Sequence, residues 1–170
     1  MSSPAPNATP VPGLARRLAA FVYEGVLLFG VVFFVGLVYA GLTQQRHALQ
    51  GRSGLALLLF LVLTAYFVLF WTRSGQTLAM KTWHLRVVDA AGRPLSAARA
   101  LLRYLLSWLW FAPALLSCWA LGVHSGWGII GSLTAGVIAY ALLARLHPQR
   151  QFLHDVLSGT RVITFLPHRP

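Results

Sequence analysis

Acidic side chains are rare in this chain, so the three that it has are the first candidates for chemistry. They are Glu24, Asp89 and Asp155, against 14 lysines and arginines in 170 residues. Glu24 is the only acid that lies inside a long apolar stretch. A carboxylate at membrane depth is costly unless it is paired, protonated or hydrated. Glu24 therefore marks either an ion or proton site, one end of a substrate path, or a structural ion pair.

Two arginines are candidate partners for this carboxylate. Arg17 lies seven positions before Glu24, which places both side chains on one helix face, two turns or about 10 Å apart. Arg103 lies near the start of a later apolar stretch, and we expect it at a matching depth. Asp155 follows the last apolar stretch and could cap backbone donors or bind an arginine. We expect Arg17, Glu24, Arg103 and Asp155 to form a charged cluster, which is either a substrate or ion pathway or a structural set that holds helices together.

No residue set in the sequence identifies an enzyme. His154, Asp155 and Ser158 include the residue types of a hydrolase triad, but neighbouring side chains point apart and the carboxylate cannot orient the imidazole. The stretch GWGIIG (126–131) matches G-x-G-x-x-G, yet it follows no strand. The six histidines show no ligand spacing and are expected at the membrane interface, and Cys118 is expected to be a buried apolar residue. We therefore predict no enzymatic activity, no metal and no cofactor.

Long apolar segments must position the charged residues. A helix crosses the hydrocarbon core in roughly 20 residues. Hydrophobic residues make up 57% of the chain and charged residues only 10%, against about 25% charged residues in a soluble domain. The predicted spans cover about 18–42, 55–72, 101–122 and 127–145. The fold class that follows is an all-α transmembrane helical bundle of four spans.

Basic residues predict the orientation of this bundle. Of the 14 lysines and arginines, only Arg46 and Arg52 lie between the first two spans, and the other 12 lie on the side that holds both termini. The positive-inside rule then places the N- and C-termini in the cytoplasm. Because the bases border apolar stretches, we expect them to face anionic lipid headgroups, and we do not expect nucleic acid as a partner.

Outside the spans, the sequence predicts a Pro-rich disordered tail and a small cytoplasmic β-element. The tail covers residues 1–13, and the membrane domain covers 14–166. The segment LRVVDAAG (85–92) predicts a hairpin over about 84–97, and TRVITF (160–165) is a further strand candidate. An isolated hairpin is marginal in water, so we expect the C-terminal strand to join it.

Small residues recur every four positions in the last span. Gly128, Ser132 and Gly136 place a groove along one helix face, which is typical of close helix packing within the bundle or between protomers. Four helices form a thin wall around a pathway. A transporter of this size is therefore expected to form a homo-oligomer or to join another membrane protein.

Three motifs, in this order, resemble the RDD family of membrane proteins, which is named for one arginine and two aspartates. RRLAAFVYE (16–24) is similar to the opening of that family and HDVLSGTRV (154–162) to its end. Its central part resembles four segments: GQTLAMK (75–81), LRVVD (85–89), PLS (94–96) and RALLR (99–103). By this resemblance Arg17 matches the arginine and Asp155 the second aspartate, whereas Glu24 replaces the first aspartate and extends the carboxylate by about one methylene.

The resemblance covers about residues 14–165 and implies a bacterial multi-pass protein of the inner membrane. Transport of ions or other solutes is the usual suggestion for such proteins, and no reaction is implied. Our leading interpretation is a component of ion or small-solute transport that uses the charged cluster. The alternative is a non-transporting membrane scaffold or partner protein whose charges are structural.

Overall fold

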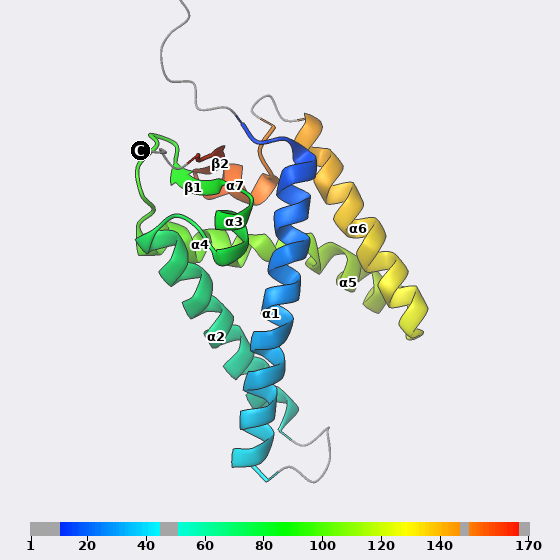
Figure 1. Ribbon diagram of the computed structural model, residues 1–170. Coiled ribbons are helices and arrows are strands. Elements are labelled where there is room, and N and C mark those ends of the chain that lie inside the picture. Colours follow the sequence, from blue (N-terminus) through cyan, green and yellow to red (C-terminus); the bar gives the residue numbers. More distant parts are fainter. Residues whose placement is uncertain (1–10, 45–50, 147–149, 167–170) are drawn as a thin grey trace, which may run out of the picture.

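The computed structural model describes residues 11–44, 51–146 and 150–166, so most of the predicted tail lies outside the described residues. Three helices are long and apolar enough to cross a membrane: α1 (Leu14–Leu42), α2 (Arg52–Arg73) and α6 (Gly126–Leu146). In Figure 1, α1 and α2 run side by side in opposite directions, and α6 slants away from α1. The predicted helical membrane bundle with a small β-element is confirmed.

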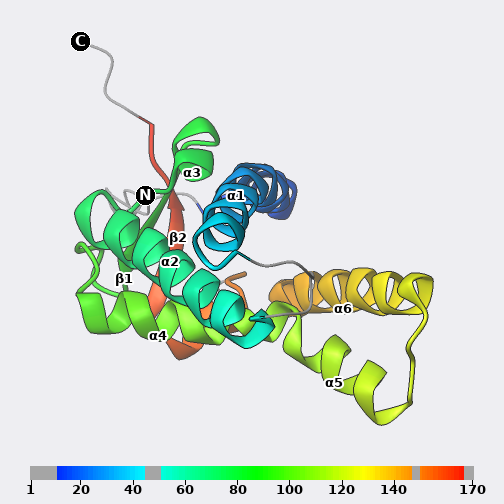
Figure 2. The ribbon, with the colours of Figure 1, turned by 90° about the horizontal axis from the view of Figure 1, so that it is seen from below.

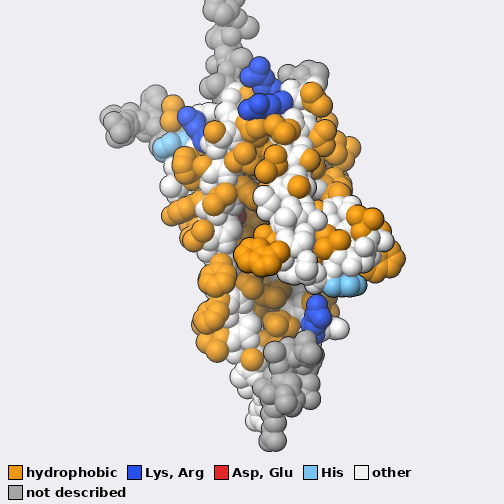
Figure 3. All heavy atoms as spheres, turned by 90° about the vertical axis from the view of Figure 1, so that its right-hand side faces the viewer, with side chains coloured by type: hydrophobic (Ala, Val, Ile, Leu, Met, Phe, Trp, Pro, Cys, Tyr) orange, Lys and Arg blue, Asp and Glu red, His pale blue; other side chains and the backbone are white. Residues whose placement is uncertain are grey.

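The long helices direct apolar side chains outward. Over its 29 residues, α1 buries only Arg17, Ala20 and Glu24, while Phe29 and Phe33 are 72% and 64% exposed. Figure 3 shows many hydrophobic side chains on this face, with most of the visible arginine or lysine near one end and a further basic group toward the other. Helices that are apolar on their outer surface suit lipid as the surrounding medium. A helix also satisfies its backbone polar groups internally, as a medium without water requires.

The third predicted span, 101–122, is not one straight helix. It is divided into α4 (Ala97–Ser107), a 3-10 turn η1 (Trp108–Trp110) and α5 (Ala112–Ala120), with a bend of 43°. Pro113 lies in the first turn of α5. Its ring would clash with the carbonyl four residues earlier in a continuous helix, so the helix breaks before it. The described residues thus contain three uninterrupted candidate spans, and a fourth only if α4 and α5 count as one.

The broken segment also takes an unexpected path. In Figure 1, α4 lies across the direction of α1 and α2, and α5 then descends next to α6. The link between α5 and α6 lies well short of the facing ends of α1 and α2 (Figure 1). Seen from below in Figure 2, the α5–α6 hairpin extends to one side of the group formed by α1, α2 and α4.

The β-element is a two-stranded antiparallel sheet. β1 (Leu85–Asp89) pairs with β2 (Thr160–Thr164), so that Leu85 lies opposite Thr164 and Asp89 opposite Thr160. The hairpin predicted over 84–97 does not form, because the next element after β1 is α4 and not a second strand. The Asp89 carboxylate accepts the backbone N–H groups of Ala91 and Arg93 and closes a tight turn. Pro94 then lacks an N–H for a ladder, and Ser96 begins α4 as its N-cap.

Side chains and a loop complete the edges of this small sheet. On β2, the Gln151 amide accepts the Val162 N–H at 3.1 Å and donates to the Val162 carbonyl at 3.3 Å. On β1, the Gly75 carbonyl accepts the Val87 N–H at 2.8 Å, and the Gln76 amide donates to the Leu85 carbonyl at 2.6 Å. Buried backbone groups therefore find partners without the expected third strand.

Two aromatic-rich clusters form the core. One lies beneath the sheet and contains Trp71, Leu85, Val87, Tyr104 and Val162, together with Ala20, Leu95 and Ala100. The other joins η1, α6 and the segment before the last helix through Trp110, Tyr140, Ala141, Ala144 and Phe152. The first turns of α1 lie between these clusters, which brings the charged residues of α1 toward both.

Candidate functional site

A cavity of about 370 Å³ lies among α1, α2, the α4–η1 segment and α7 (Leu153–Leu157). Its wall is mostly apolar and aromatic. Polar or charged side chains also line it, among them Arg17 and Glu24 of α1 and, from later parts of the chain, Thr77, Arg103 and His154. Three of the four residues of the predicted cluster therefore reach one cavity, and the fourth, Asp155, contacts it through Arg103.

Arg17 lies in the first turns of α1 and is only 4% exposed. Its Nη2 donates to the backbone carbonyl of Arg150 at 2.6 Å, and its guanidinium carbon lies 4.2 Å from the centre of the Phe152 ring. Its Nε and Nη1 have no hydrogen-bond partner in the described part of the chain. Arg17 therefore keeps donor capacity next to the cavity.

Arg103 and Asp155 form a buried ion pair. Arg103 lies on α4 and Asp155 on α7, and Arg103 Nη2 donates to Asp155 Oδ1 at 2.5 Å. Asp155 is fully buried, and the Arg103 guanidinium lies 4.4 Å from the centre of the Trp71 ring. The pair fixes α7, and with it β2, against α4.

Glu24 is held by hydroxyl groups rather than by an arginine. Its Oε1 accepts from the Tyr66 hydroxyl at 2.6 Å, and its Oε2 accepts from the Thr77 hydroxyl. Arg103, a candidate partner of this carboxylate, binds Asp155 instead. No basic group lies within 4 Å of Glu24 among the residues that the structure describes.

Tyr66 and Thr77 were not singled out from the sequence. Thr77 is fully buried and is the N-cap of α3 (Leu78–Thr82). Gly75 has a positive φ of 69°, and a Cβ at this position would lie 2.7 Å from the Val87 carbonyl. Only glycine fits this turn, which directs Thr77 to α1. The signal that could have found Thr77 is its place as a cap before LAMK.

His154 is buried beside Asp155, which corrects the expectation of an interfacial histidine. The Tyr140 hydroxyl accepts the His154 backbone N–H at 2.9 Å and lies 3.0 Å from Nδ1. If that hydroxyl donates to Nδ1, the ring proton lies on Nε2, which is 3.5 Å from Asp155 Oδ1. Burial lowers the pKa of the His154 imidazole to about 4, so the ring is neutral at pH 7.

The hydrolase triad considered for this stretch does not form. The Ser158 hydroxyl donates to the His154 carbonyl at 2.6 Å, so it caps a backbone group instead of meeting the imidazole. Among the described residues there is also no group of three His, Cys, Asp or Glu side chains with metal-binding geometry. His47, His147 and His168 lie outside the described residues.

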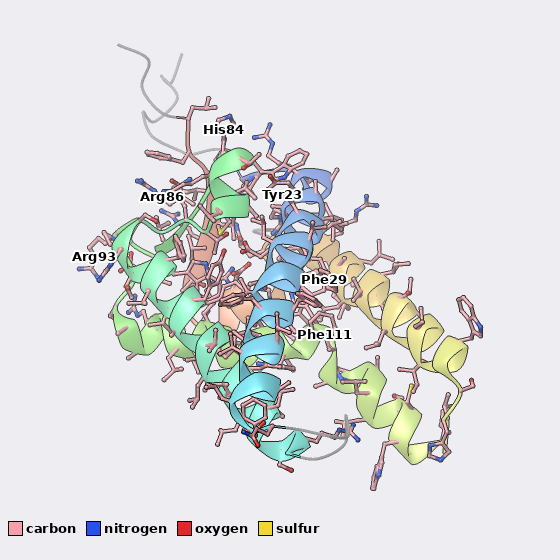
Figure 4. All side chains as sticks on the ribbon, turned by 60° about the horizontal axis from the view of Figure 1, so that its bottom comes forward. Tyr23, Phe29, His84, Arg86, Arg93 and Phe111 are labelled. Carbon is pink, nitrogen blue, oxygen red and sulfur yellow. The ribbon has the colours of Figure 1, made fainter. Side chains whose placement is uncertain are left out.

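A second charged group is separate from the cavity. Asp89 contacts Arg93 at 3.1 Å and Arg99 at 3.2 Å. The backbone N–H of Arg93 stabilises the carboxylate and lowers the pKa of Asp89. Figure 4 shows Arg86 and Arg93 at the outer edge of the molecule, near β1 and away from α1. Asp89 itself is buried at the end of β1, whereas Arg93 and Arg99 are exposed, so this group lies at the surface away from the cavity.

Of the predicted small-residue groove of α6, only the part at Gly136 packs closely against another helix. A Cβ on Gly136 would lie 2.9 Å from Ala114 Cβ, so α5 and α6 approach closely there. A Cβ on Gly128 would instead meet Val123 and Ser125 of the preceding link. Ser132 lies between them and is half-buried.

Comparison with known families matches the chain to the RDD family over residues 11–159. No significant match is found among curated proteins or among solved structures. The matched region contains all four residues of the predicted cluster and every candidate membrane helix. The described residues hold three membrane-length apolar helices, or four if the bent pair is one span, and the chain belongs to the RDD family and is a multi-pass membrane protein.

Proposed function

We propose that this protein is a component of ion or small-solute transport and that the cavity is its binding site. The observation that carries the proposal is the meeting of Arg17, Glu24 and Arg103 at one cavity inside an otherwise apolar helix bundle. Ionisable groups at membrane depth are expensive, and they commonly mark substrate or ion pathways. The function requires no enzymatic reaction, metal or cofactor.

Glu24 is the residue on which transport would depend. Its described partners are the neutral hydroxyls of Tyr66 and Thr77. A carboxylate without a fixed counter-charge can take up and release a proton or bind a cation, whereas a carboxylate in a tight ion pair cannot do so without breaking the pair. The Arg103–Asp155 pair is of the second kind.

The competing function is that of a non-transporting membrane scaffold. It is favoured by the Arg103–Asp155 contact, which joins α4 to α7 at 2.5 Å and has an obvious structural use. In this case the cavity charges would only hold segments together, and loss of Glu24 would affect stability alone.

Reconstitution of the full chain in liposomes separates the two functions. Ion, proton and solute flux would be measured under imposed gradients for the wild type and for Glu24→Gln. The glutamine keeps the side-chain length and an acceptor oxygen but cannot ionise. Asp89→Asn is the matched control, because it removes a carboxylate outside the cavity.

Transport predicts flux that Glu24→Gln abolishes in a folded protein and that Asp89→Asn leaves unchanged. Absence of flux under every gradient, together with a lower thermal midpoint for Glu24→Gln, supports the scaffold. The inner membrane of a bacterium, cytoplasmic termini, anionic lipid contacts and self-association belong to the same proposal. It is supported by the distribution of the basic residues and by the thin wall that these helices form.

A further inference from the structure

We infer that the cavity binds a small amphiphilic monoanion, a carboxylate on an apolar body about the size of one aromatic ring, with Arg17 as its charge partner. This inference rests on the proposed function, since it names the class of solute that the cavity takes. It depends on three observations: the free donors of Arg17, the absence of a direct ion pair between Arg17 and either nearby carboxylate among the described residues, and the aromatic wall next to the guanidinium.

The donors of Arg17 are the first observation. A guanidinium carries five N–H groups and cannot be deprotonated at ordinary pH. The side chain is 4% exposed, yet only Nη2 has a protein partner among the described residues, and that partner is the uncharged Arg150 carbonyl. A buried charge without a counter-ion is unfavourable. A carboxylate accepting from Nε or Nη1 would supply both the charge and the hydrogen bond.

The protein's own carboxylates are already engaged. Asp155 Oδ1 accepts from Arg103 Nη2 at 2.5 Å, so its single charge is shared with that arginine. Its Oδ2 has no hydrogen-bond partner among the described residues, but Asp155 does not come within 4 Å of Arg17. Glu24 lies two helical turns from Arg17, and both of its oxygens accept hydroxyl groups. No described acid lies within 4 Å of Arg17. The charge that Arg17 offers to the cavity is therefore available to a ligand, and it selects an anion.

The wall beside Arg17 selects an apolar body. Phe21 stacks on Trp110 at 4.7 Å between ring centres and lies 6.2 Å from Phe111, and Trp110 meets Phe152 at 4.9 Å. All four rings line the cavity, and Arg17 lies over Phe152. A hydrated inorganic anion would leave these rings without a complementary surface. An organic acid satisfies the guanidinium and the rings together, and a volume of about 370 Å³ falls at the lower end of small-molecule pockets.

Binding would be measured by titration calorimetry on the full chain in nanodiscs of neutral lipid. The probe is phenylacetate, and its uncharged isostere is phenylacetamide. The variants are Arg17→Gln and Arg16→Gln, because Arg16 is the exposed neighbour of Arg17 on the same helix. We expect saturable phenylacetate binding that weakens at least tenfold in Arg17→Gln and for phenylacetamide, and that stays unchanged in Arg16→Gln.

A second variant pair tests the cavity without altering charge, in case Arg17→Gln does not fold. Gly25 lines the cavity, whereas Gly30 on the same helix does not, and a Cβ at either position meets no atom within 4 Å. Gly25→Leu is expected to weaken phenylacetate binding at least tenfold and Gly30→Leu to leave it unchanged. Equal affinity in both, or equal affinity for acid and amide, overturns the inference.

The acid could arrive from water or from the bilayer, and a competition experiment distinguishes these sources. Dodecanoate added to the nanodiscs would displace phenylacetate if the natural ligand is a membrane amphiphile. Phenylacetate binding that dodecanoate does not displace supports a soluble acid. Failure of both acids to bind the wild type overturns the inference.

The outcome is separable from that of the transport proposal. Equilibrium binding without any flux removes transport and leaves the ligand assignment intact. Flux that depends on Glu24 but is indifferent to Arg17→Gln, in a protein that binds neither acid, removes the ligand assignment and leaves transport intact.

Discussion

Asp155 carries a buried charge that is only partly satisfied by its neighbours. It is fully buried, one carboxylate oxygen is bound to Arg103 at 2.5 Å, and the other has no partner among the described residues. Removing one member of a buried ion pair leaves an uncompensated charge and typically costs about 3–5 kcal/mol. Asp155→Asn is therefore expected to lower the free energy of unfolding in detergent by about that amount.

The control for this change is Asp89→Asn, which should lower the free energy of unfolding by less. Its partners Arg93 and Arg99 are exposed, so water screens the ion pairs that are lost. The double variant Asp155→Asn with Arg103→Leu should recover part of the loss, because it removes the orphaned cation. If the double variant is less stable by the sum of both single changes, the two side chains do not act as a pair.

His154 predicts a dependence of stability on pH. Its pKa is about 4 in the folded protein because of burial, and about 6.5 in an unfolded chain. Between these values the unfolded state binds a proton that the native state does not, so stability falls as pH decreases from about 6.5 to 4. Thermal melting of His154→Phe should show a smaller decrease over this interval than the wild type. Parallel pH profiles would contradict a buried neutral imidazole.

Among the elements, the α5–α6 hairpin depends on a single close approach. Gly136 faces Ala114 at a distance that excludes any larger side chain without a shift. Gly136→Leu should separate the two helices, and Cys118, which is buried on α5, offers the readout. We expect faster maleimide labelling of Cys118 in Gly136→Leu than in the wild type.

Gly131→Leu is the matched change, because a Cβ at Gly131 meets no atom within 4 Å. It should leave the labelling rate of Cys118 unchanged. Equal labelling in both variants would show that contact at Gly136 does not protect the thiol.

At the scale of the whole molecule, both ends of the described chain lie at the end of the bundle that carries the sheet (Figure 1). From the positive-inside rule we propose that this end is cytoplasmic. In a Cys118→Ala background, an impermeant maleimide applied to intact cells should label His124→Cys in the α5–α6 link and not Lys81→Cys beside β1. Permeabilised cells should label both. The reverse pattern would invert the proposed topology.

Local properties of the sequence determined much of this protein. Hydropathy and length identified α1, α2 and α6, because a helix that must satisfy its backbone in lipid needs a long apolar run wherever it packs. β-branched residues marked β1 and β2, and three ordered motifs indicated the RDD family. These signals lie within short stretches of chain and need no knowledge of the partners.

Only the tertiary structure decided which charges meet. Arg103 binds Asp155, 52 residues away, instead of Glu24, while Glu24 takes the hydroxyls of Tyr66 and Thr77. The break before Pro113 turned one predicted span into two helices, and side-chain amides replaced a third strand. A buried charge accepts whichever donor the packing of distant segments brings within about 3 Å, and no local pattern of residues specifies that distance.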